Sequence, residues 1–174
     1  MKRSYIVVAA IALASAALGI VVSTQRWSPD PPQDSATAAL FRQSLPDAQA
    51  AIQPLSQWQG KTLVVNFWAT WCAPCVDEMP ELSALQQKSA SKNIQIIGIG
   101  IDSAGNIKDF SLKHKITYPL YVAGVSGTEL ARKFGNQAGG LPFTVLVSPS
   151  GEVQKTYLGR LKMDELEKDL GLSL

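Results

Sequence analysis

Apolar residues run along the chain in short continuous blocks separated by glycine, proline and polar residues. The blocks 63–68 and 94–101 are almost wholly apolar, which predicts two strands buried on both faces. Two further blocks, 143–147 and 153–158, flank the turn sequence SPSG at 148–151, and this arrangement predicts a β-hairpin. The apolar pattern therefore predicts a sheet at the centre of the domain.

Helical patterns alternate with these strands. They cover four segments, with a short strand between the second and the third. The helices are expected at 75–89, about 105–115, 127–134 and 163–170, and the short strand at 119–122. Pro80 lies inside the first helix and should kink or break it, because proline removes a backbone donor. The order of these elements predicts an α/β domain with helices layered around a mixed sheet.

The stretch 36–58 has no clear period, although we expect the folded domain to cover 36–174. Six of its apolar side chains are expected to be buried: Leu40, Phe41, Leu45, Ile52, Leu55 and Trp58. Residues 23–35 come before it and are rich in proline and polar groups, which is typical of a semi-rigid linker.

An uncharged apolar segment of 18 residues, 5–22, follows Lys2 and Arg3 at the N-terminus. As a helix it would span roughly 27 Å, which suits a thin bilayer. For residues 1–22 we favour a membrane anchor rather than a cleavable signal peptide, since the apolar run continues past the small-x-small triplet at 14–16. In either case the two basic residues stay in the cytoplasm and the domain is exported, which predicts a place in the cell envelope.

Charge and cysteine content exclude several classes of protein. From Trp27 onward the chain carries 13 basic and 14 acidic residues with no basic stripe, so we expect no binding to nucleic acid. The chain has two cysteines, which is too few for the disulfide framework of a small secreted domain.

Cys72 and Cys75 form a Cys-x-x-Cys pair directly after the first strand. A structural zinc site needs four ligands, and His114 is the only histidine; haem attachment needs a histidine where Val76 stands. A disulfide across two residues constrains the unfolded chain little. A redox pair explains more. Backbone N–H groups at the helix N-terminus favour the thiolate of Cys72, and the spacing puts Cys75 one helical turn later. We expect Cys72 to attack and Cys75 to resolve.

The sequence FWATWCAPC at 67–75 resembles the active site of thioredoxin-like proteins. Over about 45–170, including GGLPFTVLVSPSGEV at 139–153, the chain resembles the TlpA/ResA type of membrane-anchored, extracytoplasmic thiol-disulfide oxidoreductase. The resemblance implies a thioredoxin-like fold, with a central mixed sheet flanked by helices. It also implies a cis peptide bond before Pro142, with the backbone of Leu141 pairing with the substrate.

Three further residues acquire roles through this resemblance. Glu78 matches the acidic residue that ResA-like proteins carry three positions after the second cysteine, which at i,i+3 is a neighbour able to accept and return the proton of Cys75. A solvated first-turn glutamate is the alternative. Asn66 replaces the buried aspartate of cytoplasmic thioredoxins and cannot act as that base. Trp71 is expected at the rim of the site, in contact with substrate, and His114 on a solvated helix surface.

The function implied is the reduction of protein disulfides, with no cofactor or bound metal. By resemblance, the clients are apocytochrome c or copper-site proteins, and a membrane electron donor restores the dithiol. Two alternatives stay open. The protein could donate its disulfide instead, since direction depends on reduction potential. It could also be an assembly chaperone that binds copper through Cys72 and Cys75.

Overall fold

The computed structural model describes residues 35–89 and 91–172. The predicted anchor at 1–22 and all but the last residue of the predicted linker lie outside these ranges. Within them, no helix combines the length and the apolar character needed to cross a membrane.

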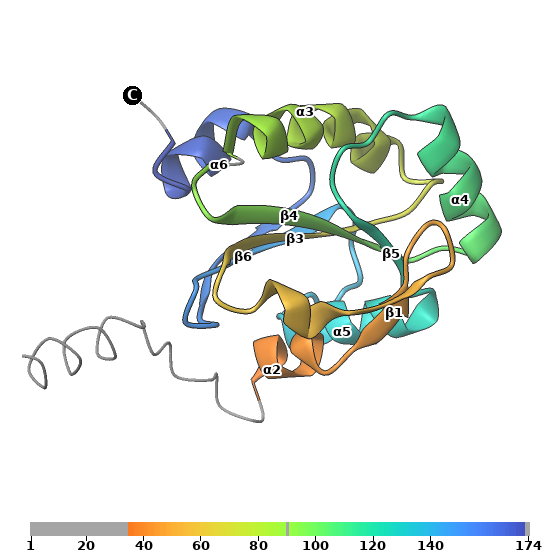
Figure 1. The fold of residues 1–174 in the computed structure, drawn as a ribbon, viewed down its shortest axis with the longest axis horizontal. Coiled ribbons are helices and arrows are strands. Elements are labelled where there is room, and N and C mark those ends of the chain that lie inside the picture. The colour runs from red at the N-terminus through yellow and green to blue at the C-terminus, as the bar shows by residue number, and fades with distance from the viewer. Residues whose placement is uncertain (1–34, 90, 173–174) are drawn as a thin grey trace, which may run out of the picture.

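A five-stranded sheet forms the centre of the domain (Figure 1). Its strands are β3 (Thr62–Trp68), β4 (Ile94–Gly100), β5 (Leu120–Val122), β6 (Phe143–Val147) and β7 (Val153–Leu158). Their spatial order is β5-β4-β3-β6-β7, with β3, β4 and β5 mutually parallel and β6 and β7 antiparallel to their neighbours. The mixed sheet predicted from the sequence is therefore confirmed.

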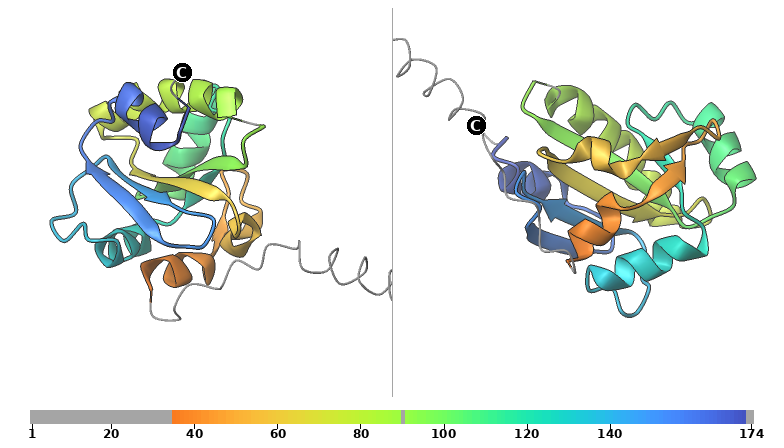
Figure 2. Two further views of the ribbon diagram at one scale, coloured as in Figure 1. Left: turned by 90° about the vertical axis from the view of Figure 1, so that its left-hand side faces the viewer. Right: turned by 60° about the horizontal axis from the view of Figure 1, so that its bottom comes forward.

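The side chains of the central strand β3 point alternately to the two faces of the sheet, and each set contributes to a separate hydrophobic core. Val64 and Trp68 pack on one face, under α3 (Ala73–Ser89), α4 (Ala104–Lys113) and α6 (Met163–Asp169). Leu63, Val65 and Phe67 pack on the other, against α2 (Ala36–Phe41) and α5 (Val125–Lys133). The views of Figure 2 keep these two helical layers on opposite sides of the sheet. This layering is the thioredoxin-like arrangement.

The stretch before β3 forms a small cap at one edge of the sheet. It contains the hairpin β1 (Ser44–Pro46) and β2 (Ile52–Pro54), followed by the 3-10 helix η1 (Leu55–Trp58). A bridge between Asp47 and Tyr121 attaches this hairpin to β5, so the edge strand is covered. Leu40, Leu45 and Leu55 are buried as predicted, and Phe41 and Trp58 are half-buried. The prediction for Ile52 was wrong: it is 65% exposed, because it lies on a two-stranded ribbon that nothing covers on its side.

Of the kink or break predicted at Pro80, the break was wrong. Helix α3 is continuous from Ala73 to Ser89. Pro80 lies on its exposed side, whereas Met79 and Leu82 are fully buried. Burial of the inner face holds the helix together across the one backbone hydrogen bond that proline cannot donate.

Gly100, at the end of β4, lies in close contact with helix α4 and with the neighbouring strand β5. A Cβ there would lie 2.3 Å from Cδ1 of Ile107 and 3.2 Å from the carbonyl oxygen of Tyr121. Helix α4 can therefore approach β4 only over a residue that has no side chain.

Gly100→Ala should lower the free energy of unfolding by about 1–3 kcal/mol, because the added methyl overpacks a well-filled core. Urea unfolding followed by circular dichroism measures the change. Gly105→Ala is the matched control. Its Cβ would meet nothing within 4 Å, and in α4 it should stabilise by up to about 1 kcal/mol. Equal effects of the two substitutions would contradict the packing argument.

Candidate active site

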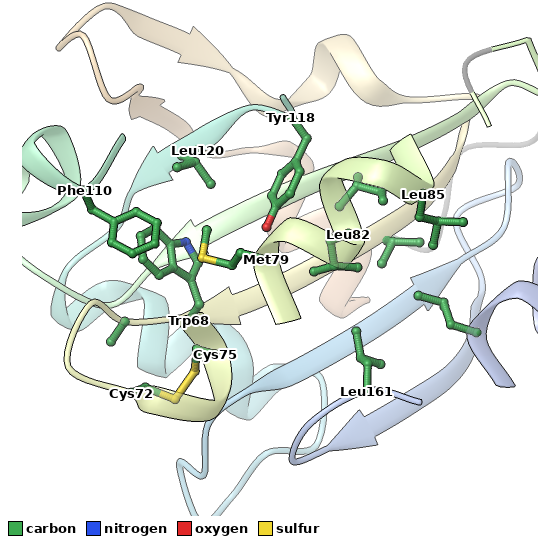
Figure 3. Packing of buried hydrophobic residues seen from close by; sticks show 14 of the residues in the cluster. Trp68, Cys72, Cys75, Met79, Leu82, Leu85, Phe110, Tyr118, Leu120 and Leu161 are labelled. Atoms are coloured by element: carbon green, nitrogen blue, oxygen red, sulfur yellow. A yellow bond between two sulfur atoms is a disulfide. The ribbon is translucent and has the colours of Figure 1, made fainter. Parts of the chain in front are cut away.

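Cys72 and Cys75 are joined by a disulfide at the first turn of α3 (Figure 3). The S–S distance is 2.05 Å and the two Cα atoms lie 5.3 Å apart. The carbonyl of Cys72 accepts a hydrogen bond from the N–H of Val76 at 3.1 Å, so Cys72 occupies the position directly before the helix. Its sulfur therefore lies where helix N–H groups stabilise a thiolate.

The two sulfurs differ in access. Cys72 is 6% exposed, whereas Cys75 is fully buried beside Trp68 and Met79 (Figure 3). An incoming disulfide can therefore reach Cys72 first, while Cys75 is sheltered from solvent. This order of access is the one that an attacking and a resolving cysteine require.

The Leu141–Pro142 peptide bond is cis, as the resemblance implies. Strand β6 begins directly after it, and Phe143 pairs with Phe67 on the antiparallel neighbour β3. Since β3 runs on from Phe67 toward Cys72, this register carries Leu141 and Pro142 to the same edge of the sheet as the cysteines. Pro142 is buried and Leu141 is half-buried against both cores.

Glu78 is fully buried, which excludes the alternative of a solvated glutamate. Its carboxylate accepts two hydrogen bonds, one from Nδ2 of Asn66 to Oε1 at 2.8 Å and one from the backbone N–H of Leu161 to Oε2 at 2.9 Å. Asn66 comes from β3, and Leu161 lies between β7 and α6. The acid is thus held between two segments that are far apart in sequence.

Burial raises the pKa of Glu78 from 4.5 to about 7. The hydrogen bonds from Leu161 and Asn66 and the charge of Arg160 oppose this rise, while the charge of Glu81 adds to it. A carboxyl with such a pKa can both accept and release a proton near neutral pH, which is what a general acid-base partner needs.

Asn66 can serve both protonation states of this acid. Its Nδ2 donates to Glu78 and also to Oγ1 of Thr144, at 3.0 Å, on the facing strand. Its Oδ1 is buried and has no hydrogen-bond partner among the described residues. With Glu78 protonated, a rotated Asn66 amide would present this acceptor to the new O–H donor. Asn66 is therefore a partner of the acid rather than a base.

Trp71 is 70% exposed beside the disulfide, so its indole is available to a bound polypeptide. The loop that carries it is fixed by Asp102, a residue that the sequence reasoning missed. The carboxylate of Asp102 accepts hydrogen bonds from the N–H and the hydroxyl of Thr70, next to Trp71. It also accepts from Nδ2 of Asn106 at 2.7 Å. The only signal for Asp102 was its place directly after a predicted strand end.

His114 lines a cavity together with Thr70 and Val76, and its expected position was wrong. It follows the last residue of α4 instead of standing on the helix surface, and it is half-buried. Its ring stacks on Phe110, with 4.2 Å between centroids and 17° between planes. In the described ranges, no group of three or more histidine, cysteine or acidic side chains converges to hold a metal ion.

Comparison with known proteins agrees with this site. Residues 37–156 match the AhpC/TSA family. The chain belongs to the AhpC/TSA family. It is 32% identical over 120 residues to the thiol-disulfide oxidoreductase ResA of Oceanobacillus iheyensis, a match that covers 68% of this chain and 60% of the relative. It is 26% identical over 127 residues to ResA of Geobacillus thermodenitrificans, covering 72% and 71%.

The fold has close counterparts among solved structures. A secreted disulfide oxidoreductase of Mycobacterium tuberculosis, homologous to E. coli DsbE, superposes with a TM-score of 0.62 at 20% identity, covering 78% of this chain and 98% of that one. At this identity the likeness shows the thioredoxin-like fold. The ResA relatives are named thiol-disulfide oxidoreductases, and this chain carries a Cys72–Cys75 disulfide within the same family fold.

The oxidised protein should become less stable as pH rises from about 4.5 to about 7. In this window the folded protein keeps the Glu78 proton that the unfolded chain releases, so a higher pH favours unfolding. The interval corresponds to roughly 3 kcal/mol. Urea unfolding at a series of pH values measures the slope. Glu78→Gln should lack it, since a glutamine side chain does not titrate; an unchanged slope in that variant would assign it to other groups.

Proposed function

We propose that the protein reduces disulfides of exported proteins, with Cys72 as nucleophile, Cys75 as resolving cysteine and Glu78 as the proton partner of Cys75. The observation that carries the proposal is the combination of a slightly exposed cysteine, a fully buried cysteine and a buried carboxyl around the first turns of one helix. The different burial of the two cysteines and the raised pKa of Glu78 support these roles.

The exchange runs in two steps that together move two electrons from the dithiol to the client. The Cys72 thiolate attacks one sulfur of the client disulfide, the client S–S bond breaks, and the first client thiolate leaves as the mixed disulfide forms. Glu78 then takes the proton of Cys75, whose thiolate attacks the Cys72 sulfur and displaces the second client thiolate. The Cys72–Cys75 disulfide forms, and the proton on Glu78 passes to the released thiolate or to solvent.

The surface around Cys72 supplies the binding site for the client in this proposal. The backbone of Leu141, before the cis bond to Pro142, pairs with the extended client chain, and the exposed indole of Trp71 packs against it. Neither contact depends on a particular client side chain, because one uses backbone groups and the other apolar surface. Clients of the apocytochrome c or copper-site kind are consistent with such broad recognition.

The expected location supports the reducing direction of electron flow. With an anchor at 1–22 and the domain outside the cytoplasm, client cysteines meet an oxidising environment and need a reductant. A membrane electron donor then returns the Cys72–Cys75 disulfide to the dithiol. Donation of the disulfide is the reverse reaction of the same groups, so the state of the clients distinguishes the two.

Trapping tests this function directly. With Cys75→Ser in the full chain, expressed in its own cell envelope, client proteins should accumulate as mixed disulfides on Cys72, because the resolving thiol is absent. Mass spectrometry after non-reducing separation identifies them. In cells that lack the protein, the same clients should have oxidised cysteines if it is a reductant and reduced cysteines if it is an oxidant. Absence of any mixed disulfide, with tight Cu(I) binding by the reduced chain, would favour the copper chaperone instead.

The role of Glu78 has its own test. Glu78→Gln should slow resolution of a preformed mixed disulfide by about 10²-fold at neutral pH and should abolish the rise of the rate near pH 7. Stopped-flow measurement over a range of pH checks both effects. Asp77→Asn, which alters the exposed neighbouring acid, should leave the profile unchanged. A Glu78→Gln variant with the wild-type profile would remove Glu78 from the mechanism.

A further inference from the structure

Three consecutive residues after β7, Gly159–Leu161, each contact a different part of the site. We call this segment the strap. The N–H of Gly159 donates to the carbonyl of Pro142 at 2.8 Å. Nη2 of Arg160 lies 2.7 Å from Oε1 of Glu81 on α3. The N–H of Leu161 donates to the buried carboxylate of Glu78 at 2.9 Å. The strap therefore contacts the Leu141–Pro142 segment (the cis-proline loop), helix α3 and the carboxylate of Glu78.

The geometry of the strap makes these contacts dependent on one another. Gly159 has φ of +87°, a conformation that lets the chain turn sharply out of β7. Two residues later the side chain of Leu161 is buried beneath α3 (Figure 3). With one end bonded to Pro142 and the other embedded in the core, little slack is left between the cis-proline loop and the Leu161 N–H. A shift of the Leu141–Pro142 segment would therefore act on the Leu161 hydrogen bond to Glu78.

We infer that the strap is a positioning element that couples client binding at the Leu141–Pro142 loop to the proton affinity of Glu78. This rests on the proposed function, in which the loop binds the client and Glu78 handles the proton of Cys75. By linkage the coupling is reciprocal, so protonation of Glu78 changes client affinity by the same factor. Binding of a client then changes the proton affinity of Glu78.

The charges around Glu78 indicate how the strap acts. Arg160 stabilises the carboxylate, and Glu81 and the nearby Asp77 both favour the cation at Arg160. Tyr118, from the segment before β5, faces Glu78 as a neutral phenol, because burial and the charge of Glu78 hold its pKa well above the ordinary value. Asn66 and Thr144 are neutral. Loosening the strap removes a cation and a hydrogen-bond donor from Glu78, and both losses raise its proton affinity.

The first test breaks the strap's ion pair. In the 15N-labelled oxidised full chain, the Leu161 amide resonance reports protonation of Glu78 through their hydrogen bond. Arg160→Gln should move the titration midpoint to higher pH, with a roughly 1.5- to 5-fold larger protonation constant, since the pair is partly exposed. Lys88→Gln is the control: it breaks the 2.6 Å pair that Lys88 of α3 forms with Glu167 of α6, with the same loss of charge. It should leave the midpoint unchanged.

The second test adds a client. In the Cys75→Ser chain, a cysteine-containing peptide is joined to Cys72 through a mixed disulfide, and the control carries S-methyl in its place. Both have the same sulfur chemistry, but only the peptide can pair with the backbone of Leu141. The peptide should change the protonation constant of Glu78 by about fivefold or more relative to S-methyl. Arg160→Gln should reduce this difference.

These results separate the inference from the proposed function. Equal midpoints for Arg160→Gln and wild type, or for peptide and S-methyl, would overturn the coupling. Neither measurement requires turnover, so both shifts can appear even where Glu78→Gln leaves the exchange rate unchanged. In that case the inference about the strap stands, and the proposed role of Glu78 as proton partner of Cys75 is rejected.

Discussion

A fully buried carboxylate must be hydrogen bonded, and the site is organised around satisfying Glu78. Its two acceptor oxygens use Nδ2 of Asn66 on β3 and the backbone N–H of Leu161 after β7. Asn66 is in turn bonded to Thr144 on β6. One acid thus ties the catalytic helix to two strands and to the segment that leaves the sheet. Any of these elements that moved would leave a buried polar group without a partner, so the geometry of the site is fixed as a unit.

The same constraint explains why the two cysteines are unequal. Helix α3 must lie close enough to β3 for Glu78 to reach Asn66, and this approach buries Cys75, one turn before Glu78, beneath Trp68. Cys72 stands before the helix on a loop held by Asp102, where its edge still meets solvent. This packing supports the proposed order of reaction, in which a client sulfur meets the outer cysteine first.

Much of the fold and of the site could be predicted from the sequence, because these features depend on which side chains are present and how they are spaced. Strands β3 and β4 were recognisable as buried apolar blocks, and the Cys-x-x-Cys spacing after a strand indicated the chemistry. The backbone donor of Leu161 was not predictable, because an N–H carries no residue-type signal and its target is 83 positions away. Ile52 and Pro80 misled for a related reason: exposure is decided by which neighbours the fold supplies, and periodicity in a short segment cannot supply that information.

The exchange of aspartate for asparagine at position 66 has a physical reason once Glu78 is in place. An aspartate there would set a second carboxylate within hydrogen-bond distance of the first in a buried site. The two would have to share one proton, so that neither would titrate as a simple base near neutral pH. Asn66 avoids this conflict and supplies a donor and a free acceptor to a single acid. Placing that acid on α3 also keeps it on the same rigid element as Cys75, so their separation is maintained while the loops around them adjust to a client.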